Sequence, residues 1–262
     1  MSAFALRVAA SFVVAGTWIG AATVVAERYG SRIGGLVGNL PSTIVVSFIF
    51  ITLTQDLAYT TRVAQAVPVG MTIDTGFMLL FVLGARINLA VAIAASLAGW
   101  FAMALAANRL GLPAWPVGGL LCLGACTLVF LVMEKGLKLR TRTARQVTYT
   151  LPQMLARIAF AGTVVAVSVI VARFSGPYWT GLFSTFPAVM LSTLVILYLT
   201  QGRAFASATA KILTISAPNI LVFAFVASTV FPRVGLAAGL LAGYTAAALF
   251  IVALRPLVSR VS

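Results

Sequence analysis

The sequence predicts an all-helical polytopic membrane protein, with nine transmembrane helices arranged as two inverted four-helix repeats joined by a linker helix. The 262-residue chain is 61% hydrophobic and only 8% charged, whereas a soluble domain carries roughly 25% charged residues. Apolar runs of about 20 residues, long enough to cross a membrane as a helix, recur along the chain. Two of these runs are copies of each other, which indicates an internal duplication.

The two copies extend from Gly35 to Gln55 and from Gly181 to Gln201, and each carries a proline within its apolar run. They align without gaps at an offset of 146 residues, with six of 21 positions identical. The prolines, Pro41 and Pro187, predict that transmembrane helices 2 and 7 are broken or kinked near the middle of the membrane. Paired interruptions of this kind are typical of secondary transporters.

The apolar runs place the nine spans at 4–26, 33–54, 64–85, 87–107, 114–133, 155–174, 178–200, 212–231 and 235–255. The first span resembles the sixth, so we expect it to be retained and not cleaved as a signal peptide. Spans 1–4 match spans 6–9, and the single linker span means that the second copy enters from the opposite face. The predicted organisation is a first repeat at 1–110, a linker helix and basic cytoplasmic loop at 111–153, and an inverted second repeat at 154–262.

The 18 basic residues are divided unevenly between the two sides that these spans define. Five lie on the side of the N-terminus, and thirteen lie on the other side, including Arg157, Lys211 and the basic run from Lys135 to Arg145. The positive-inside rule therefore predicts an N-terminus outside and a C-terminus in the cytoplasm, in a multi-pass protein of a bacterial inner membrane. We expect the basic run to contact membrane lipids with anionic head groups, and we expect no nucleic-acid partner.

The composition argues against an enzyme. The chain has no histidine and only four acids, Glu27, Asp56, Asp74 and Glu134, so it is poorly equipped for hydrolytic or redox catalysis and no catalytic residue is expected. Cys122 and Cys126 are one helical turn apart and are predicted to be packing residues, with no metal site and no cofactor. The four tryptophans, including Trp100, fall near predicted span ends and are expected to be interface anchors.

The run from Gly176 to Leu213 resembles the signature of small bacterial inner-membrane proteins of the GlpM-like type, an aromatic-x-x-Gly-Leu-x-x-x-Phe-Pro motif before a long apolar run. The matching residues are Tyr178, Gly181, Leu182, Phe186 and Pro187. The resemblance covers about 100 residues of the second half and, more weakly, the first half, where Leu40 replaces the phenylalanine. It implies that the chain is a fused duplicate of such a unit. That family is poorly characterised, so the chemistry is argued from the residues.

Glycines and helix-capping residues precede both prolines, which predicts a half-helix that begins inside the membrane in each copy. Inverted symmetry would bring the two half-helix N-termini together, and their free N–H groups would form an anion site. The alternative is a pair of ordinary proline kinks. The expected substrate-binding residues are Gly38, Asn39, Pro41, Ser42, Thr43, Ser184, Thr185, Pro187 and Asn219.

Asp74 lies about halfway along the third span, where an ionised carboxylate costs at least ~2.5–3.5 kcal/mol on insertion scales. We expect this residue to couple transport to H⁺ or Na⁺ by binding the ion. The alternative is a structural aspartate that is hydrogen-bonded to Thr72 or Thr75.

The leading functional hypothesis is a small secondary active transporter that moves an anion or small anionic solute. One alternative is a flippase for a phosphate-bearing polyprenyl lipid, in which the same site holds the lipid phosphate. The other is a non-transporting accessory subunit of an envelope polysaccharide synthesis machine. A central polar cavity favours solute transport, a lateral opening at the prolines favours flipping, and a packed, dry midplane favours the accessory subunit.

Overall fold

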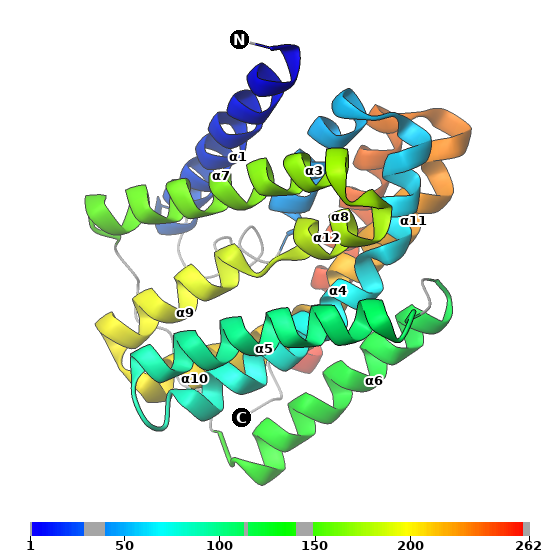
Figure 1. Ribbon diagram of the computed structural model, residues 1–262. Coiled ribbons are helices and arrows are strands. Elements are labelled where there is room, and N and C mark those ends of the chain that lie inside the picture. The colour runs from blue at the N-terminus through cyan, green and yellow to red at the C-terminus, as the bar shows by residue number, and fades with distance from the viewer. Residues whose placement is uncertain (1, 29–39, 113–114, 140–148, 259–262) are drawn as a thin grey trace.

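A computed structural model describes residues 2–28, 40–112, 115–139 and 149–258, and every regular element in these ranges is a helix (Figure 1). The predicted all-helical class is confirmed. The elements in chain order are α1 (Ala3–Arg28), α3 (Ser42–Thr54), α4 (Leu57–Gly84), α5 (Leu89–Arg109), α6 (Val117–Leu131), the π-helix η1 (Val132–Gly136), α7 (Leu151–Phe174), α8 (Gly176–Thr185), α9 (Ala188–Gln201), α10 (Arg203–Ser216), α11 (Pro218–Val234) and α12 (Leu236–Val258).

Within the described residues, eight helical segments are long and apolar enough to cross a membrane, which supports a multi-pass membrane protein. Three of these segments combine two helices: α6 with η1, α8 with α9, and α10 with α11. The helix α3 has 13 residues and is shorter than a full span. The predicted second span begins within 29–39, which lies outside the described residues.

The helix α4 is the centre of the bundle, because α5, α6, α8 and α11 all pack against it. Close approaches to α4 depend on residues without a side chain. A Cβ atom at Gly181 of α8 would lie 2.9 Å from the carbonyl oxygen of Val63 and 2.7 Å from Cβ of Ala66, both on α4. A Cβ atom at Gly84 of α4 would lie 2.7 Å from Cα of Ala92 on α5. The neighbouring helices can therefore approach the backbone of α4 directly.

The two predicted prolines occupy the same local structure. Pro41 has φ −74° and ψ 52°, and Pro187 has φ −78° and ψ 47°. In both places the residue after the proline donates its N–H to the carbonyl of the residue before it, at 2.7 Å. This is an inverse γ-turn, and a helix begins directly after it. The predicted break in helix 7 is present, since α8 ends at Thr185 and α9 begins at Ala188.

The repeat spacing also holds for helix starts, but one break was not predicted. The starts of α3 and α9 are 146 residues apart, and so are the starts of α4 and α10. In the first half α4 continues for 28 residues, with Pro68 inside it. In the second half the corresponding segment divides into α10 and α11, and Pro218 is the first residue of α11. The predicted single span at 212–231 is therefore two helices.

Candidate functional site

The Asp74 side chain is buried between α4 and α5, with only 2% of the residue exposed. Its Oδ1 accepts a hydrogen bond of 2.8 Å from Nε1 of Trp100, and its Oδ2 has no hydrogen-bond partner among the described residues. The hydroxyls of Thr72 and Thr75 donate to carbonyls of their own helix, to Pro68 and Met71 respectively. The side-chain partner of Asp74 is therefore Trp100 and neither of these threonines.

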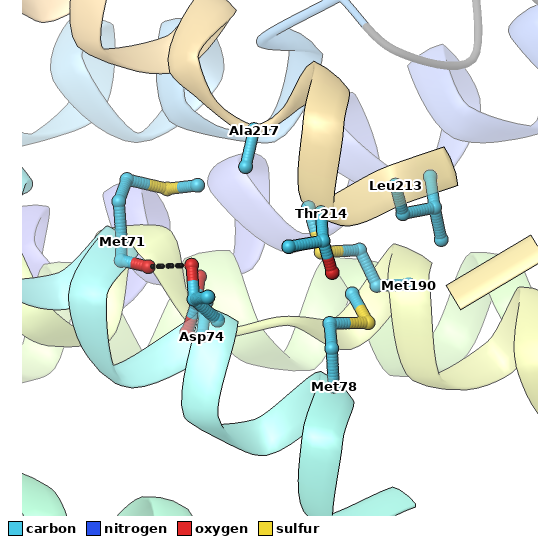
Figure 2. Close-up of a pocket in the computed structure, with 8 residues that line it drawn as sticks. Met71, Asp74, Met78, Met190, Leu213, Thr214 and Ala217 are labelled. Atoms are coloured by element: carbon cyan, nitrogen blue, oxygen red, sulfur yellow. Dashed lines mark hydrogen bonds between the residues drawn. The ribbon is translucent and has the colours of Figure 1, made fainter. Parts of the chain in front are cut away.

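A small pocket opens beside Asp74 (Figure 2). It lies next to two helix breaks, because α9 begins just after Pro187 and Ala217 is the last residue before α11. The gap between the lining atoms is too narrow for a water molecule. The residues that line it are Met71, Asp74, Thr75 and Met78 of α4, Met190 of α9, Leu213 and Thr214 of α10, and Ala217.

Trp100 connects Asp74 to the break at Pro187. It is fully buried, so the prediction that it anchors the helix at the membrane interface is wrong. Its ring centre lies 4.8 Å from that of Phe186, the residue before Pro187, and 5.6 Å from that of Phe183 on α8. Phe186 in turn lies 6.2 Å from Phe160 on α7. An aromatic cluster therefore joins α5, α7 and the break, with the indole N–H directed at Asp74.

The end of α8 also approaches α4 close to Asp74. A side chain at Gly70 would overlap the hydroxyl of Thr185, and Gly70 is one helical turn before Asp74. Thr185 and Ser184 donate their hydroxyls to Leu182 and Gly181 within α8. The predicted residues of the second break therefore lie near Asp74, although their hydroxyls are occupied by their own helix.

The first break is placed differently. Pro41 and Ser42 are buried and Thr43 is half-buried at the start of α3, a helix that packs on α1, α7 and α8. No residue of α3 is among those that line the Asp74 pocket. Asn219 is buried in the first turn of α11, two residues after Ala217. Gly38 and Asn39 lie outside the described residues, so the predicted meeting of two half-helix N-termini stays a prediction.

Two basic residues that the charge count placed on the cytoplasmic side, Arg157 and Lys211, are buried. Arg157 lies in α7 with 8% of the residue exposed, and its Nη1 donates to Oγ1 of Thr193 on α9 at 2.7 Å. Its Nε is buried and has no hydrogen-bond partner in the part of the chain that the structure describes. An arginine at the third position of a predicted span carries no sequence signal that separates a buried side chain from one that extends to the interface.

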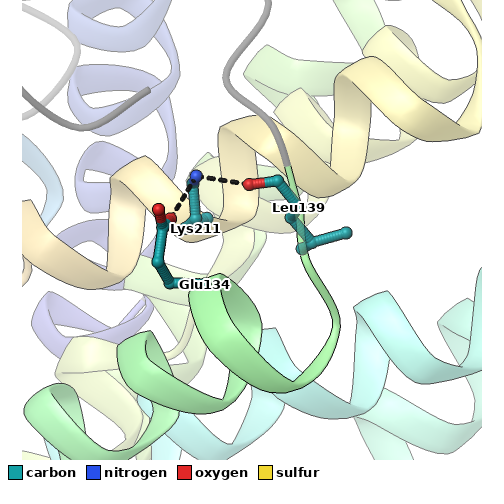
Figure 3. A network of polar contacts seen from close by, with 3 residues as sticks. All are labelled: Glu134, Leu139 and Lys211. Carbon is teal, nitrogen blue, oxygen red and sulfur yellow. Dashed lines mark hydrogen bonds and ion pairs between the residues drawn. The ribbon is translucent and has the colours of Figure 1, made fainter.

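The other buried basic residue, Lys211 of α10, is paired. Its ammonium group donates to Oε2 of Glu134 at 2.6 Å and to the carbonyl oxygen of Leu139 at 2.5 Å (Figure 3). Glu134 belongs to the π-helix that follows α6. The pair ties α10 to the end of the linker helix, one turn from Thr214 in the Asp74 pocket.

The two cysteines, on α6, lie close to Thr75, the neighbour of Asp74 on α4. Cys126 Sγ is 3.3 Å from Oγ1 of Thr75, and the two sulfur atoms are 4.0 Å apart. Both thiols are buried and free, and they pack α6 on α4. In the described part of the chain, no three His, Cys, Asp or Glu side chains are grouped as metal ligands.

Comparisons with protein families, with curated proteins and with solved structures find no match to this chain.

Proposed function

We propose that this chain is a small secondary active transporter for an anion or small anionic solute, coupled to H⁺ or Na⁺ through Asp74. The observation that carries the proposal is the Asp74 carboxyl group, which is buried among apolar helices with one oxygen unpartnered. Ionisable residues inside a membrane are costly and mark ion or proton pathways. The pocket of Asp74 lies beside two helix breaks, and the proposal expects the backbone segments at these breaks to move against Asp74 during transport.

The finer architecture belongs to the same proposal. Nine spans form two inverted four-helix repeats, with the N-terminus outside and the C-terminus in the cytoplasm of a bacterial inner membrane. The common γ-turn at Pro41 and Pro187 and the common spacing of helix starts support the duplication. The fused GlpM-like origin rests on the sequence motif alone.

Topology can be tested with a single cysteine at position 141, in a chain whose two native cysteines are replaced by serine. The proposal expects labelling by a membrane-impermeant maleimide only after the inner membrane is opened. Labelling of intact cells or spheroplasts from outside would reverse the orientation.

The coupling role is tested in proteoliposomes that contain the purified protein, by following the uptake of labelled inorganic phosphate, sulfate and small carboxylates under a pH or Na⁺ gradient. The proposal expects gradient-driven accumulation of at least one of these anions. Asp74→Asn keeps the shape of the side chain and removes its charge, so it abolishes accumulation but leaves anion exchange. Asp56→Asn is the matched control, because Asp56 is an exposed N-cap and asparagine caps equally well. If Asp74→Asn accumulates anions with an unchanged pH and Na⁺ dependence, Asp74 is structural.

A second candidate function is the non-transporting accessory subunit, and one observation favours it. The midplane around Asp74 is packed and the adjoining pocket does not admit water. A transporter closed to both sides has the same appearance, so the uptake experiment separates the two. The accessory role requires no flux of any anion under either gradient.

A further inference from the structure

The Arg157 guanidinium is a buried cation on a membrane-spanning helix. The residue lies in the second turn of α7 and is 8% exposed. Nη1 donates one hydrogen bond to Thr193, whereas Nε is buried and makes no hydrogen bond to any described residue. The Tyr149 ring lies 5.1 Å from Cζ, which offsets part of the desolvation but offers no negative charge.

No carboxylate neutralises this charge in the described part of the chain. Asp56, Asp74 and Glu134 are the acids whose side chains the structure describes, and only Glu134 forms an ion pair, with Lys211. An arginine stays protonated inside a protein. A buried charge that keeps no partner is strongly unfavourable, so the position demands a negative group that the described residues do not supply.

The helix α9 connects Arg157 to the Asp74 pocket. Thr193, which accepts from Arg157, is three residues after Met190, which lines the pocket, so both side chains lie on one face of α9. On α7, Phe160 follows Arg157 by one turn and contacts Phe186 at the break. The N-terminus of α9 is the positive end of its helix dipole, which adds to the positive potential near the guanidinium.

We propose that Arg157, positioned by Thr193, binds an oxyanion group, a carboxylate or a phosphate, through its free Nε edge. The planar fork of the guanidinium matches two oxygens of one such group, which a halide does not provide. This inference rests on the proposed transport function and narrows its substrate class to oxyanions. A free solute and an anionic lipid head group share this chemistry.

The test uses purified full-length protein and its thermal unfolding midpoint, Tm, because a ligand of the folded state raises Tm as its concentration increases. Inorganic phosphate and acetate are compared with chloride at equal ionic strength in detergent. A second arm compares nanodiscs of phosphatidylglycerol with nanodiscs of phosphatidylcholine. The proposal expects a saturable Tm rise from phosphate or acetate, or from phosphatidylglycerol if the source is a lipid, and none from chloride.

The variants decide whether Arg157 is responsible. Arg157→Gln abolishes the Tm rise, and Arg157→Lys, which keeps the charge but loses the fork, weakens the affinity by roughly tenfold or more. Arg173→Gln is the matched control, since Arg173 is an exposed arginine on the same helix and also lies over an aromatic ring. If Arg157→Gln does not fold, Arg157→Lys and Thr193→Val take its place.

Equal Tm rises in the wild type and the Arg157 variants overturn the assignment, and so does the absence of a rise in both arms. The outcome is separable from that of the transport proposal. If uptake depends on Asp74 and Arg157→Gln has an unchanged anion affinity, the oxyanion site is refuted and the transport proposal stands. If anion binding depends on Arg157 but no gradient drives uptake, the oxyanion site stands and the transport proposal is refuted.

Discussion

The ammonium group of Lys211 lies 2.6 Å from the carboxylate of Glu134, and the two partners are buried to different extents. The lysine side chain is fully buried, whereas the glutamate side chain is 29% exposed. The lysine therefore needs its counter-ion more than the glutamate does, because water can still solvate the carboxylate of Glu134 but does not reach the ammonium group of Lys211.

This asymmetry predicts unequal effects of removing either partner. Glu134→Gln leaves a buried cation without its counter-ion and lowers the free energy of unfolding by on the order of 3 kcal/mol. Lys211→Met leaves an accessible carboxylate and costs less. Thermal unfolding in detergent measures both, with the exposed Lys135→Met as the control. A larger loss for Lys211→Met would contradict this account.

The packing of α8 on α4 makes a prediction about glycine. Gly181→Ala places a methyl group 2.9 Å from a backbone carbonyl of α4 that cannot rotate away, so we expect a loss of about 1–3 kcal/mol. Gly124→Ala in α6 meets no atom within 4 Å and gains about 0.5–1 kcal/mol from helix propensity. Opposite shifts of Tm in the two variants are the expected result. Equal shifts would mean that α8 does not depend on this close approach.

The hydrogen bond between Trp100 and Asp74 is tested by removing its donor. Trp100→Phe leaves both carboxyl oxygens of Asp74 buried without a partner, which costs about 1–3 kcal/mol beyond the lost ring contacts. Trp115→Phe is the control, because the indole N–H of Trp115 is buried and has no acceptor. The comparison of Tm values isolates the hydrogen bond, and a similar loss in both variants would show that it contributes little.

The sequence predicts the features that depend on local chemistry. Apolar runs give the helices, and a proline after capping residues gives the break at Pro187 and the start of α3, because both effects act within a few residues. The break at Pro218 was missed because this proline is the seventh residue of the predicted span 212–231, where a proline can also kink a helix that continues.

The site itself depends on packing that the sequence does not display. Asp74 stands out because an acid in an apolar run is rare, but its partner Trp100 is 26 residues away on another helix. Arg157 and Lys211 were counted as loop charges, since a long basic side chain near a span end usually extends to the interface. Only the tertiary contacts with Thr193 and Glu134 distinguish these residues from the basic residues that are exposed.

The two γ-turns lead to a final prediction about three prolines. The rings of Pro41 and Pro187 hold φ near the value that an inverse γ-turn needs. Each proline is the residue directly before a helix, α3 and α9 respectively. Replacement by alanine widens the range of unfolded conformations and costs about 0.4–1 kcal/mol. Because the two turns have the same geometry, Pro41→Ala and Pro187→Ala should lower Tm by similar amounts. Pro187→Ala should also impair transport, since α8 and α9 can then join and displace Phe186 from Trp100.

Pro68 provides the contrast, because it lies inside the continuous helix α4, where proline removes a backbone hydrogen bond and strains the preceding turn. Pro68→Ala should therefore raise Tm while the other two substitutions lower it. A rise in Tm for Pro187→Ala as well would mean that the break is strained and is retained for motion of α9 against Asp74. If Pro41→Ala and Pro187→Ala lower Tm by clearly different amounts, the two turns have the same geometry but contribute differently to stability.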